Sequence, residues 1–160
     1  MYLVDTDVIS AGAPSRLASA ELIAWMDAHS EALFLSAVTV AEIEDGIAKL
    51  RREGASRKGA RLAAWLEAML HLYEGRILPF DTPTARIAGI LSDRARGRGQ
   101  APGLADIILA ATAQHRSLTI LSRNARHFIP LDVPVIDPFA DLPTVKTGAS
   151  AIGAGQRARA

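Results

Sequence analysis

Four acidic residues stand where hydrophobic segments of the sequence end or begin. Asp5 and Asp7 follow the apolar run at residues 2–4, Glu42 lies within SAVTVAEIEDGI, and Asp106 lies within GLADIILAATA. The first three have ordinary explanations, because Asp is a favoured N-cap and Glu42 follows a threonine in a capping-box pattern. Asp106 is different, since its neighbours are almost all apolar and a buried carboxylate needs a partner or a cation.

Carboxylates of this kind predict a site for a hard divalent cation. Oxygen ligands suit Mg²⁺ or Mn²⁺, and the chain has no cysteine that could offer sulfur. A cation held by a few carboxylates polarises a phosphoryl oxygen and activates water. The acids therefore indicate phosphate-ester chemistry, provided that the fold brings them together.

The elements that must position these acids follow from hydrophobic periodicity. Strands alternate with amphipathic helices, which predicts an α/β fold with a parallel sheet and helices on both of its faces. We expect strands at residues 2–4, 32–37, 76–80, 117–122 and 134–137, and helices at residues 18–29, 38–52, 57–73, 82–95 and 104–115.

Such a sheet would collect the polar residues at one edge. The carboxyl ends of parallel strands lie together, and the helix that follows each strand begins there. If the strands at 2–4 and 117–122 are neighbours, Asp5, Asp106 and Asn124 converge.

Arginine residues near these positions suggest a polyanionic substrate. Arg94, Arg96 and Arg98 lie in a basic, glycine-rich loop expected at residues 94–103, and Arg123 directly follows the fourth strand. These guanidinium groups could hold nucleic-acid phosphates. The other reading is a solvated helix end, where cations are favoured by the helix dipole.

Composition and length set the remaining bounds. The 160 residues are 49% hydrophobic and 22% charged with a net charge of +1, which is typical of one folded domain. No segment reads as a signal peptide or a membrane span, so we expect a cytoplasmic protein. We expect the domain to cover residues 1–141, and residues 142–160 to form a flexible basic tail.

Taken in order, VDTDVIS, SAVTVAEIEDGI, GLADIILAATA and ILSRNARHF resemble a PIN-domain ribonuclease, and in particular the VapC toxins with their FitB-like relatives. The resemblance covers about residues 1–138. It implies a three-layer α/β/α fold with a parallel sheet of about five strands. It also implies a Mg²⁺- or Mn²⁺-dependent endoribonuclease that cleaves RNA, forms a homodimer and is silenced by a cognate antitoxin.

The resemblance also assigns roles to the acids. Asp5, Glu42 and Asp106 match the metal-site acids, with Asp5 and Asp106 as direct ligands and Glu42 completing the site or orienting water. Asn124 takes the fourth catalytic position, where an acid is common, so the occupancy of a second metal is open.

Further residues near this fourth position have less definite readings. Ser122 is expected to hydrogen-bond within the site and belongs with the candidate substrate-binding residues. His127 reads as a surface residue, and Asp7 either adds charge or caps the first helix.

Two alternatives concern partners. The chain could instead be a PIN-fold module that binds nucleic acid and regulates transcription with a partner, with weak cleavage or none. The helix at 57–73 could pack on the sheet, or it could help to form an antitoxin groove near the segments of Trp25 and Trp65.

Overall fold

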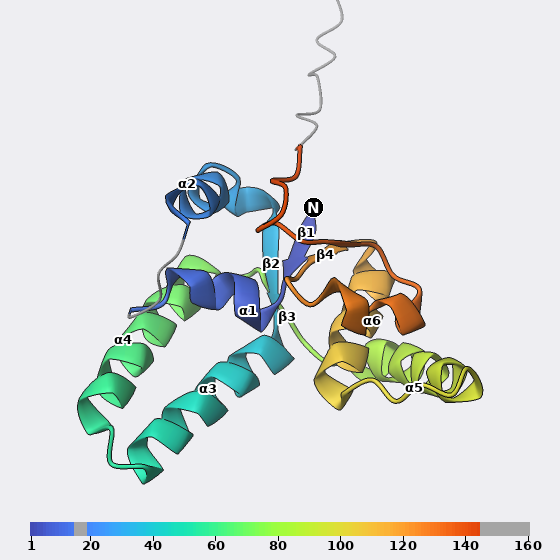
Figure 1. The fold of residues 1–160 in the computed structure, drawn as a ribbon, viewed down its shortest axis with the longest axis horizontal. Helices are drawn as coiled ribbons and strands as arrows, with labels where there is room; N and C mark the ends of the chain where they lie inside the picture. Colours follow the sequence, from blue (N-terminus) through green and yellow to red (C-terminus); the bar gives the residue numbers. More distant parts are fainter. Residues whose placement is uncertain (15–18, 145–160) are drawn as a thin grey trace, which may run out of the picture.

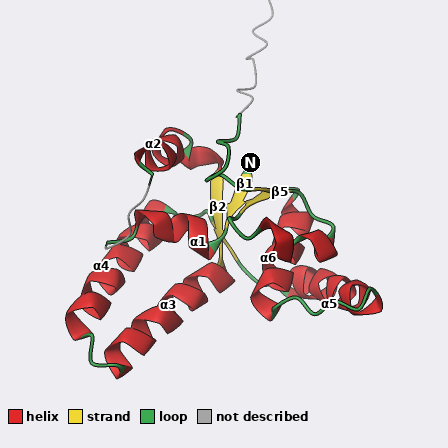
Figure 2. Cartoon of the chain, in the orientation of Figure 1, coloured by secondary structure: helices red, strands yellow, loops and turns green. Residues whose placement is uncertain are grey.

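A five-stranded parallel sheet forms the centre of the computed structural model, which describes residues 1–14 and 19–144. The strands are ordered β3-β2-β1-β4-β5, so β1 lies between β2 and β4 (Figures 1 and 2). The predicted parallel sheet and the predicted neighbourhood of the first and fourth strands are both confirmed. Their bounds are β1 Tyr2–Val4, β2 Leu33–Ser36, β3 Ile77–Leu78, β4 Thr119–Leu121 and β5 Val135–Ile136.

Helices cover both faces of this sheet and form the expected three layers. One group, α1 to α4, lies on one side of the sheet, and α5 with α6 lies on the other (Figure 1). The bounds are α1 Thr6–Ile9, α2 Ala20–Ala28, α3 Ala37–Arg52, α4 Ser56–Leu72, α5 Thr82–Gly97 and α6 Leu104–Arg116. Short 3₁₀ turns follow at Ser10–Gly12, Ser30–Ala32, Ala125–His127 and Ile129–Leu131.

The alternation of side chains along β1 divides the hydrophobic core into two. Tyr2 and Val4 pack into the cluster under α1 to α4, whereas Leu3 packs into the cluster under α5 and α6. Successive strand residues point to opposite faces, so one short strand can anchor both layers. The residues of α6 from Ile107 to Ala113 are all buried. This explains why that helix is apolar nearly all round.

Local capping signals place several helix ends where the sequence predicts them. Ser19 is the N-cap of α2, and its hydroxyl accepts a hydrogen bond from the backbone N–H of Leu22. Asp81 is the N-cap of α5, and its carboxylate accepts a hydrogen bond from the backbone N–H of Thr84. The extent of α5 differs from the prediction, because the helix continues through Gly97. Part of the expected basic loop is therefore helical.

Packing of the chain continues past the expected domain boundary. The indole N–H of Trp25 donates to the backbone oxygen of Pro143 at 3.0 Å, and Leu142 packs against the first core cluster. The rest of the expected tail, from residue 145, lies outside the described residues. Within residues 1–14 and 19–144, no helix is long and apolar enough to cross a membrane.

Candidate metal centre

Asp5 is the most enclosed acid of the site. It follows β1 and caps α1, and only 8% of its surface is exposed. One carboxylate oxygen accepts from the backbone N–H of Thr6 at 2.7 Å, and the other accepts from the buried hydroxyl of Ser122 at 2.6 Å. Burial raises the pKa of Asp5, and the negative charge of Asp106 raises it further, while these two hydrogen bonds lower it. The N-cap reading and the site reading of Asp5 are therefore compatible.

Asp7 ties the start of α1 to the loop after β4. Its Oδ2 accepts from the backbone N–H of Arg123 at 3.1 Å and from the side-chain amide of Asn124 at 3.2 Å. Its Oδ1 is buried and has no hydrogen-bond partner among the described residues. Burial and the nearby charge of Asp5 raise the pKa of Asp7 to about 6. One oxygen of this carboxylate is thus unpaired, and the carboxylate is affected by the charge of Asp5.

Glu42 faces the site from α3. Its carboxylate accepts a hydrogen bond from the hydroxyl of Thr6, on α1. Partial burial raises its pKa, and the charges of Asp5 and Asp106 raise it further. The capping-box alternative is wrong, because α3 is capped by Ser36, whose hydroxyl accepts from Val38.

Asp106 lies in the first turn of α6, on the opposite side of the sheet edge from Glu42. Its Oδ2 stands 3.5 Å from the Nδ1 of His127, and its side chain is 23% exposed. Charge interactions connect Asp106 with both Asp5 and Glu42. The structure therefore places the three acids that the sequence analysis proposes as metal ligands within reach of one another's charges.

Ser122 and Asn124 complete the acid cluster from the loop after β4. The Ser122 hydroxyl accepts from the backbone N–H of Asn124 at 3.0 Å while it donates to Asp5. The amide of Asn124 donates to Asp7. Both residues therefore reach the cluster, and they fix the carboxylates through neutral donors.

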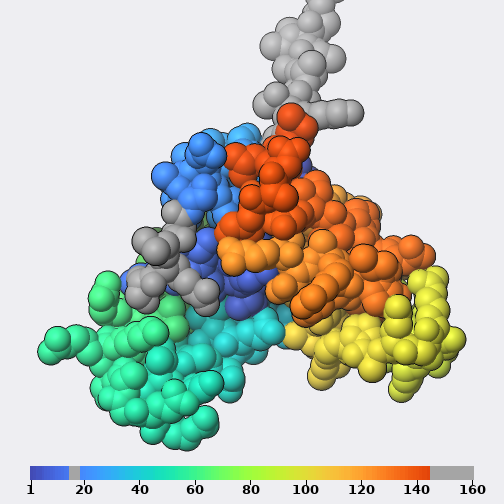
Figure 3. Space-filling view, in the orientation of Figure 1, coloured from blue at the N-terminus to red at the C-terminus, as the bar shows by residue number. Residues whose placement is uncertain are grey.

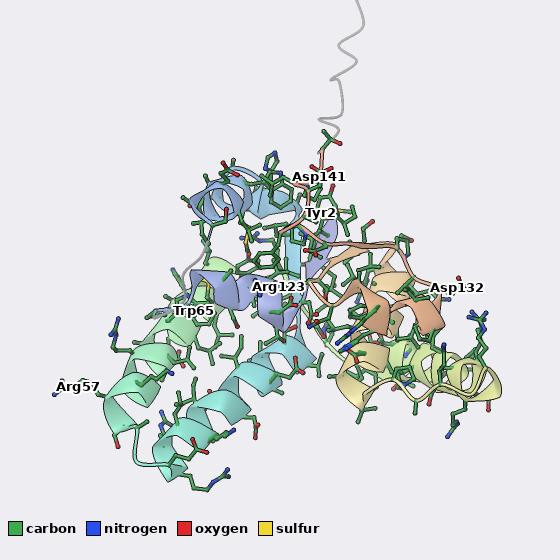
Figure 4. The ribbon with its side chains drawn as sticks, in the orientation of Figure 1. Tyr2, Arg57, Trp65, Arg123, Asp132 and Asp141 are labelled. Carbon is green, nitrogen blue, oxygen red and sulfur yellow. The ribbon has the colours of Figure 1, made fainter. Side chains whose placement is uncertain are left out.

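The arginine residues separate into two groups. Arg123 is an exposed residue that lies near the middle of the view in Figure 4, and its guanidinium stacks on the ring of Phe139 at 3.8 Å. Arg98 pairs with Asp132 at 3.8 Å, and Asp132 lies near the right edge of Figure 4, away from Arg123.

Arg94 and Arg96 lie in the last turn of α5, where Arg96 is 3.9 Å from Asp93. Arg94 and Arg96 are therefore placed as the alternative of a solvated helix end predicts. The structure thus places Arg123, and not the α5 group, beside the acids.

The types of donor suit a divalent cation. Three carboxylates affect one another electrostatically, and Asp7, whose Oδ1 is unpaired, is affected by the charge of Asp5. Charges that repel one another in a partly buried place are stabilised by a bound cation. As they stand among residues 1–14 and 19–144, however, no three or more acid or histidine side chains form a group that could hold a metal ion.

Three contacts of the site were missed by sequence reasoning. Thr6 holds Glu42, Asp7 holds the loop of Asn124, and His127 stands next to Asp106. Each contact joins segments that are far apart in the sequence, so no local pattern predicts it. The available signal was the position of Thr6 and Asp7 shortly after β1 and of Asn124 shortly after β4.

Comparisons with known proteins agree with this geometry. The family model of the PIN domain matches residues 2–132. The chain is 38% identical over 143 residues to Toxin FitB of Neisseria gonorrhoeae, covering 88% of this chain and all of the relative. It is 33% identical over 144 residues to VapC ribonuclease Y4jK of Sinorhizobium fredii, covering 87% of this chain and 98% of the relative.

Solved structures show the same likeness. The crystal structure of FitAcB from Neisseria gonorrhoeae superposes with a TM-score of 0.76 at 38% identity, covering 87% of this chain and 99% of the other. The structure of FitAB bound to an IR36 DNA fragment gives a TM-score of 0.74 at 36% identity, covering 87% and 96%.

Proposed function

Because this chain belongs to the PIN-domain family, we propose that it is a metal-dependent endoribonuclease and the toxin of a toxin–antitoxin pair. The observation that carries the proposal is the convergence of Asp5, Glu42 and Asp106 at the carboxyl edge of the sheet, where each is within the electrostatic reach of the others. The names of the relatives, a toxin and a ribonuclease, support the same activity. Such a toxin would act on RNA in the cytoplasm.

Each acid has a distinct role in this mechanism. Asp5 and Asp106 would hold Mg²⁺ or Mn²⁺, and the bound ion would supply polarisation of a phosphoryl oxygen and a more acidic water. Glu42 is kept in place by Thr6 and would orient the attacking water and take its proton. Asn124 and Ser122 fix the carboxylates from the β4 side.

Arg123 would supply the contact with the substrate. Arg123 is exposed, and its guanidinium carbon lies 3.8 Å from the centre of the Phe139 ring, so its N–H groups could reach a phosphate oxygen. We expect Arg94, Arg96 and Arg98 to contribute less, since the latter two already pair with Asp93 and Asp132.

A groove between α1, α3 and α4 is the proposed docking surface of the antitoxin. Its volume is about 860 Å³, and it begins at Thr6 and Glu42, beside the acids. Figure 3 shows α3 and α4 projecting from the body of the molecule, away from α5. An occupant of this groove would end at the catalytic residues and block them.

The chemistry of the groove suits an amphipathic peptide. The apolar residues of the lining include Ile43, Leu50 and Leu62, and the cations Arg57 and Lys58 stand at its outer end. Peptides dock in such grooves through spaced apolar anchors. The segment of Trp65 belongs to this groove, because Arg61 and Leu62 of α4 line it, whereas Trp25 packs in the core against Tyr2 and does not line it.

A second candidate function is favoured by the relatives. Structures of FitAB and of VapBC from Salmonella typhimurium were solved with DNA, the latter with a TM-score of 0.71 at 20% identity. A homodimer of this chain that acts with its antitoxin on DNA, with weak or no cleavage, would use the same fold. The presence of an amide at Asn124 in place of an acid is the feature of this chain that fits it.

The test is cleavage of total cellular RNA by the full chain, with Mg²⁺ or Mn²⁺ and with a chelator. We expect cleavage that is lost in Asp106→Asn and in Glu42→Gln and is retained in Glu44→Gln, an exposed acid two residues further along α3. Circular dichroism would show that each variant is folded. Folded wild-type protein that binds the ion but cleaves no RNA would favour the DNA-bound regulatory function.

A further inference from the structure

Phe139 gives Arg123 a neighbour of a particular kind. The guanidinium carbon of Arg123 lies 3.8 Å from the centre of the Phe139 ring, a distance at which a cation is attracted to the face of an aromatic ring. Phe139 follows β5 and lies outside residues 2–132, the part of the chain that matches the PIN-domain family model. The family resemblance therefore assigns no role to this ring.

The segment that carries Phe139 is held at several points. The backbone N–H of Phe139 donates to the Oδ1 of Asp137 at 2.9 Å, and the backbone N–H groups of Ala140 and Asp141 donate to the backbone oxygen of Asp137, each at 3.2 Å. The side chain of Phe139 is partly buried and packs against the first core cluster. The ring is therefore a fixed surface, and a side chain stacked on it loses freedom before any ligand binds.

The backbone of Arg123 is fixed at the same edge of the sheet. The N–H of the preceding residue, Ser122, donates to the backbone oxygen of Ile136 at 3.0 Å, and the N–H of Arg123 donates to the Oδ2 of Asp7 at 3.1 Å. Burial raises the pKa of Asp7, and the positive charge of Arg123 counteracts that rise. The guanidinium is thus near enough to the acids for its charge to act on one of them.

Stacking leaves the polar groups of this guanidinium available. Its N–H groups lie around the edge of a planar group, so contact of one face with a ring does not consume them. Within residues 1–14 and 19–144, no carboxylate forms a salt bridge with Arg123. The side chain is therefore oriented by a ring and not by an anion, which leaves its charge for a ligand.

We propose that Phe139 is a positioning residue for RNA binding, and that its ring holds the Arg123 guanidinium in the orientation that takes a phosphate group of the RNA beside the catalytic acids. This inference rests on the proposed function, since it concerns the substrate contact of the same site. A free arginine side chain has many rotamers and must give them up when it binds a phosphate. A ring that already holds the guanidinium removes part of that cost.

The test is RNA binding by the full chain in the presence of a chelator, so that binding is measured without cleavage. The probe is a fluorescein-labelled single-stranded RNA of mixed sequence, and fluorescence anisotropy at low salt gives its affinity. We expect Phe139→Leu to weaken binding about fivefold. Phe139→Tyr keeps the ring and should bind as tightly as the wild type. Thermal unfolding would show that each variant is folded.

The matched control is the same substitution at another exposed phenylalanine. Phe80 is 43% exposed and follows β3, which lies at the opposite edge of the sheet from β5. Phe80→Leu should leave the affinity for the RNA unchanged.

A double-mutant cycle separates positioning from a general loosening of the fold. Arg123→Ala should weaken binding more than Phe139→Leu does, and Phe139→Leu should have no further effect when it is added to Arg123→Ala. A loosened segment would lower the affinity whether or not Arg123 is present. In cleavage assays with Mn²⁺, Phe139→Leu should raise KM about fivefold and leave kcat unchanged, because the ring acts on binding and not on the acids.

The outcomes separate this inference from the proposed function. A folded Phe139→Leu variant that binds RNA as the wild type does would overturn the role of Phe139, as would an equal loss of affinity in the Arg123→Ala background. The nuclease would stand in both cases, because it depends on the acids. A chain that shows the expected binding effects and yet cleaves no RNA would support the role of Phe139 and overturn the metal-dependent nuclease.

Discussion

Removal of the Ser122 hydroxyl should weaken the folded protein and the metal site together. Ser122 is fully buried, donates to Asp5 at 2.6 Å and accepts from the backbone of Asn124 at 3.0 Å. A hydrogen bond to a charged group contributes about 1.5–3 kcal/mol to stability. The hydrogen bond from the Asn124 N–H adds little to this, because that group is near solvent. We therefore expect Ser122→Ala to lower the free energy of unfolding by about 2 kcal/mol at pH 7.5. In a chain of this length that corresponds to a melting temperature lower by about 4–8 °C.

The loss should depend on pH in a defined direction. The Ser122 hydrogen bond lowers the pKa of Asp5 relative to the variant, so its contribution is present when Asp5 is ionised and is lost as pH falls. Urea unfolding at pH 7.5 and at pH 4, in the presence of a chelator, should show the larger difference at the higher pH. The control is Ser92→Ala, a serine on α5. Equal unfolding free energies for wild type and Ser122→Ala at pH 7.5 would refute this reasoning.

Three further predictions use other contacts. Asp7→Asn should stabilise the chelator-treated protein by about 1 kcal/mol above pH 6 and should not stabilise it below pH 4. The reason is that a pKa raised from 3.8 to about 6 makes the ionised folded state unfavourable, while partial exposure reduces the effect. A difference in unfolding free energy between variant and wild type that is the same at both pH values in urea titrations would contradict this prediction. Gly103→Ala would place a Cβ 3.3 Å from the Oδ2 of Asp106. Calorimetry should therefore show weaker Mn²⁺ binding, while the free energy of unfolding stays the same. Unchanged Mn²⁺ binding would contradict this prediction. Arg76→Met should lower the free energy of unfolding in urea by about 2 kcal/mol, since Arg76 donates to the backbone oxygen of Leu72 at 2.6 Å. Mn²⁺ binding should stay the same. A change in Mn²⁺ affinity would contradict a purely structural role of Arg76.

Much of the fold could be predicted because its signals are local. The period of apolar residues and the cap at Asp81 locate the start of α5, and the uniformly apolar run after Asp106 predicts a buried α6. The first strand was predicted with its observed bounds, and the other four were predicted two or three residues too wide, as for β3 at Ile77–Leu78, because hydrophobic runs continue beyond the paired residues. The end of α5 was missed because Gly97 marks a loop in the sequence while the packed helix extends to it.

The sequence predicts which polar residues lie at one edge of the sheet, and it does not predict the contacts that join them. The edge of a parallel sheet gathers the residues that follow each strand, so Asp5 and Asn124 could be placed at the same edge from the order of the elements alone. Thr39 illustrates the limit, because it fits a capping box in sequence, yet its hydroxyl is buried without a hydrogen-bond partner in the described structure. The capping alternative for Glu42 is excluded by the cap at Ser36, and the contact that holds the Glu42 side chain comes from Thr6, thirty-six residues away in the chain.

The way in which these acids are held has a consequence for their chemistry. Asp5, Asp7 and Glu42 accept hydrogen bonds from hydroxyl, backbone and amide groups, all of them neutral. Within the described residues, the site acid with a potentially cationic neighbour within 4 Å is Asp106, 3.5 Å from His127, a contact that is an ion pair only when the ring is protonated; Arg123 is stacked on a ring. Neutral donors fix the geometry of carboxylates without cancelling their charge. A guanidinium in the same place would fix the geometry and also cancel the charge, and so exclude a metal. The cluster therefore keeps a negative charge that a divalent ion can neutralise, and binding of that ion should raise the stability of the folded chain by mass action.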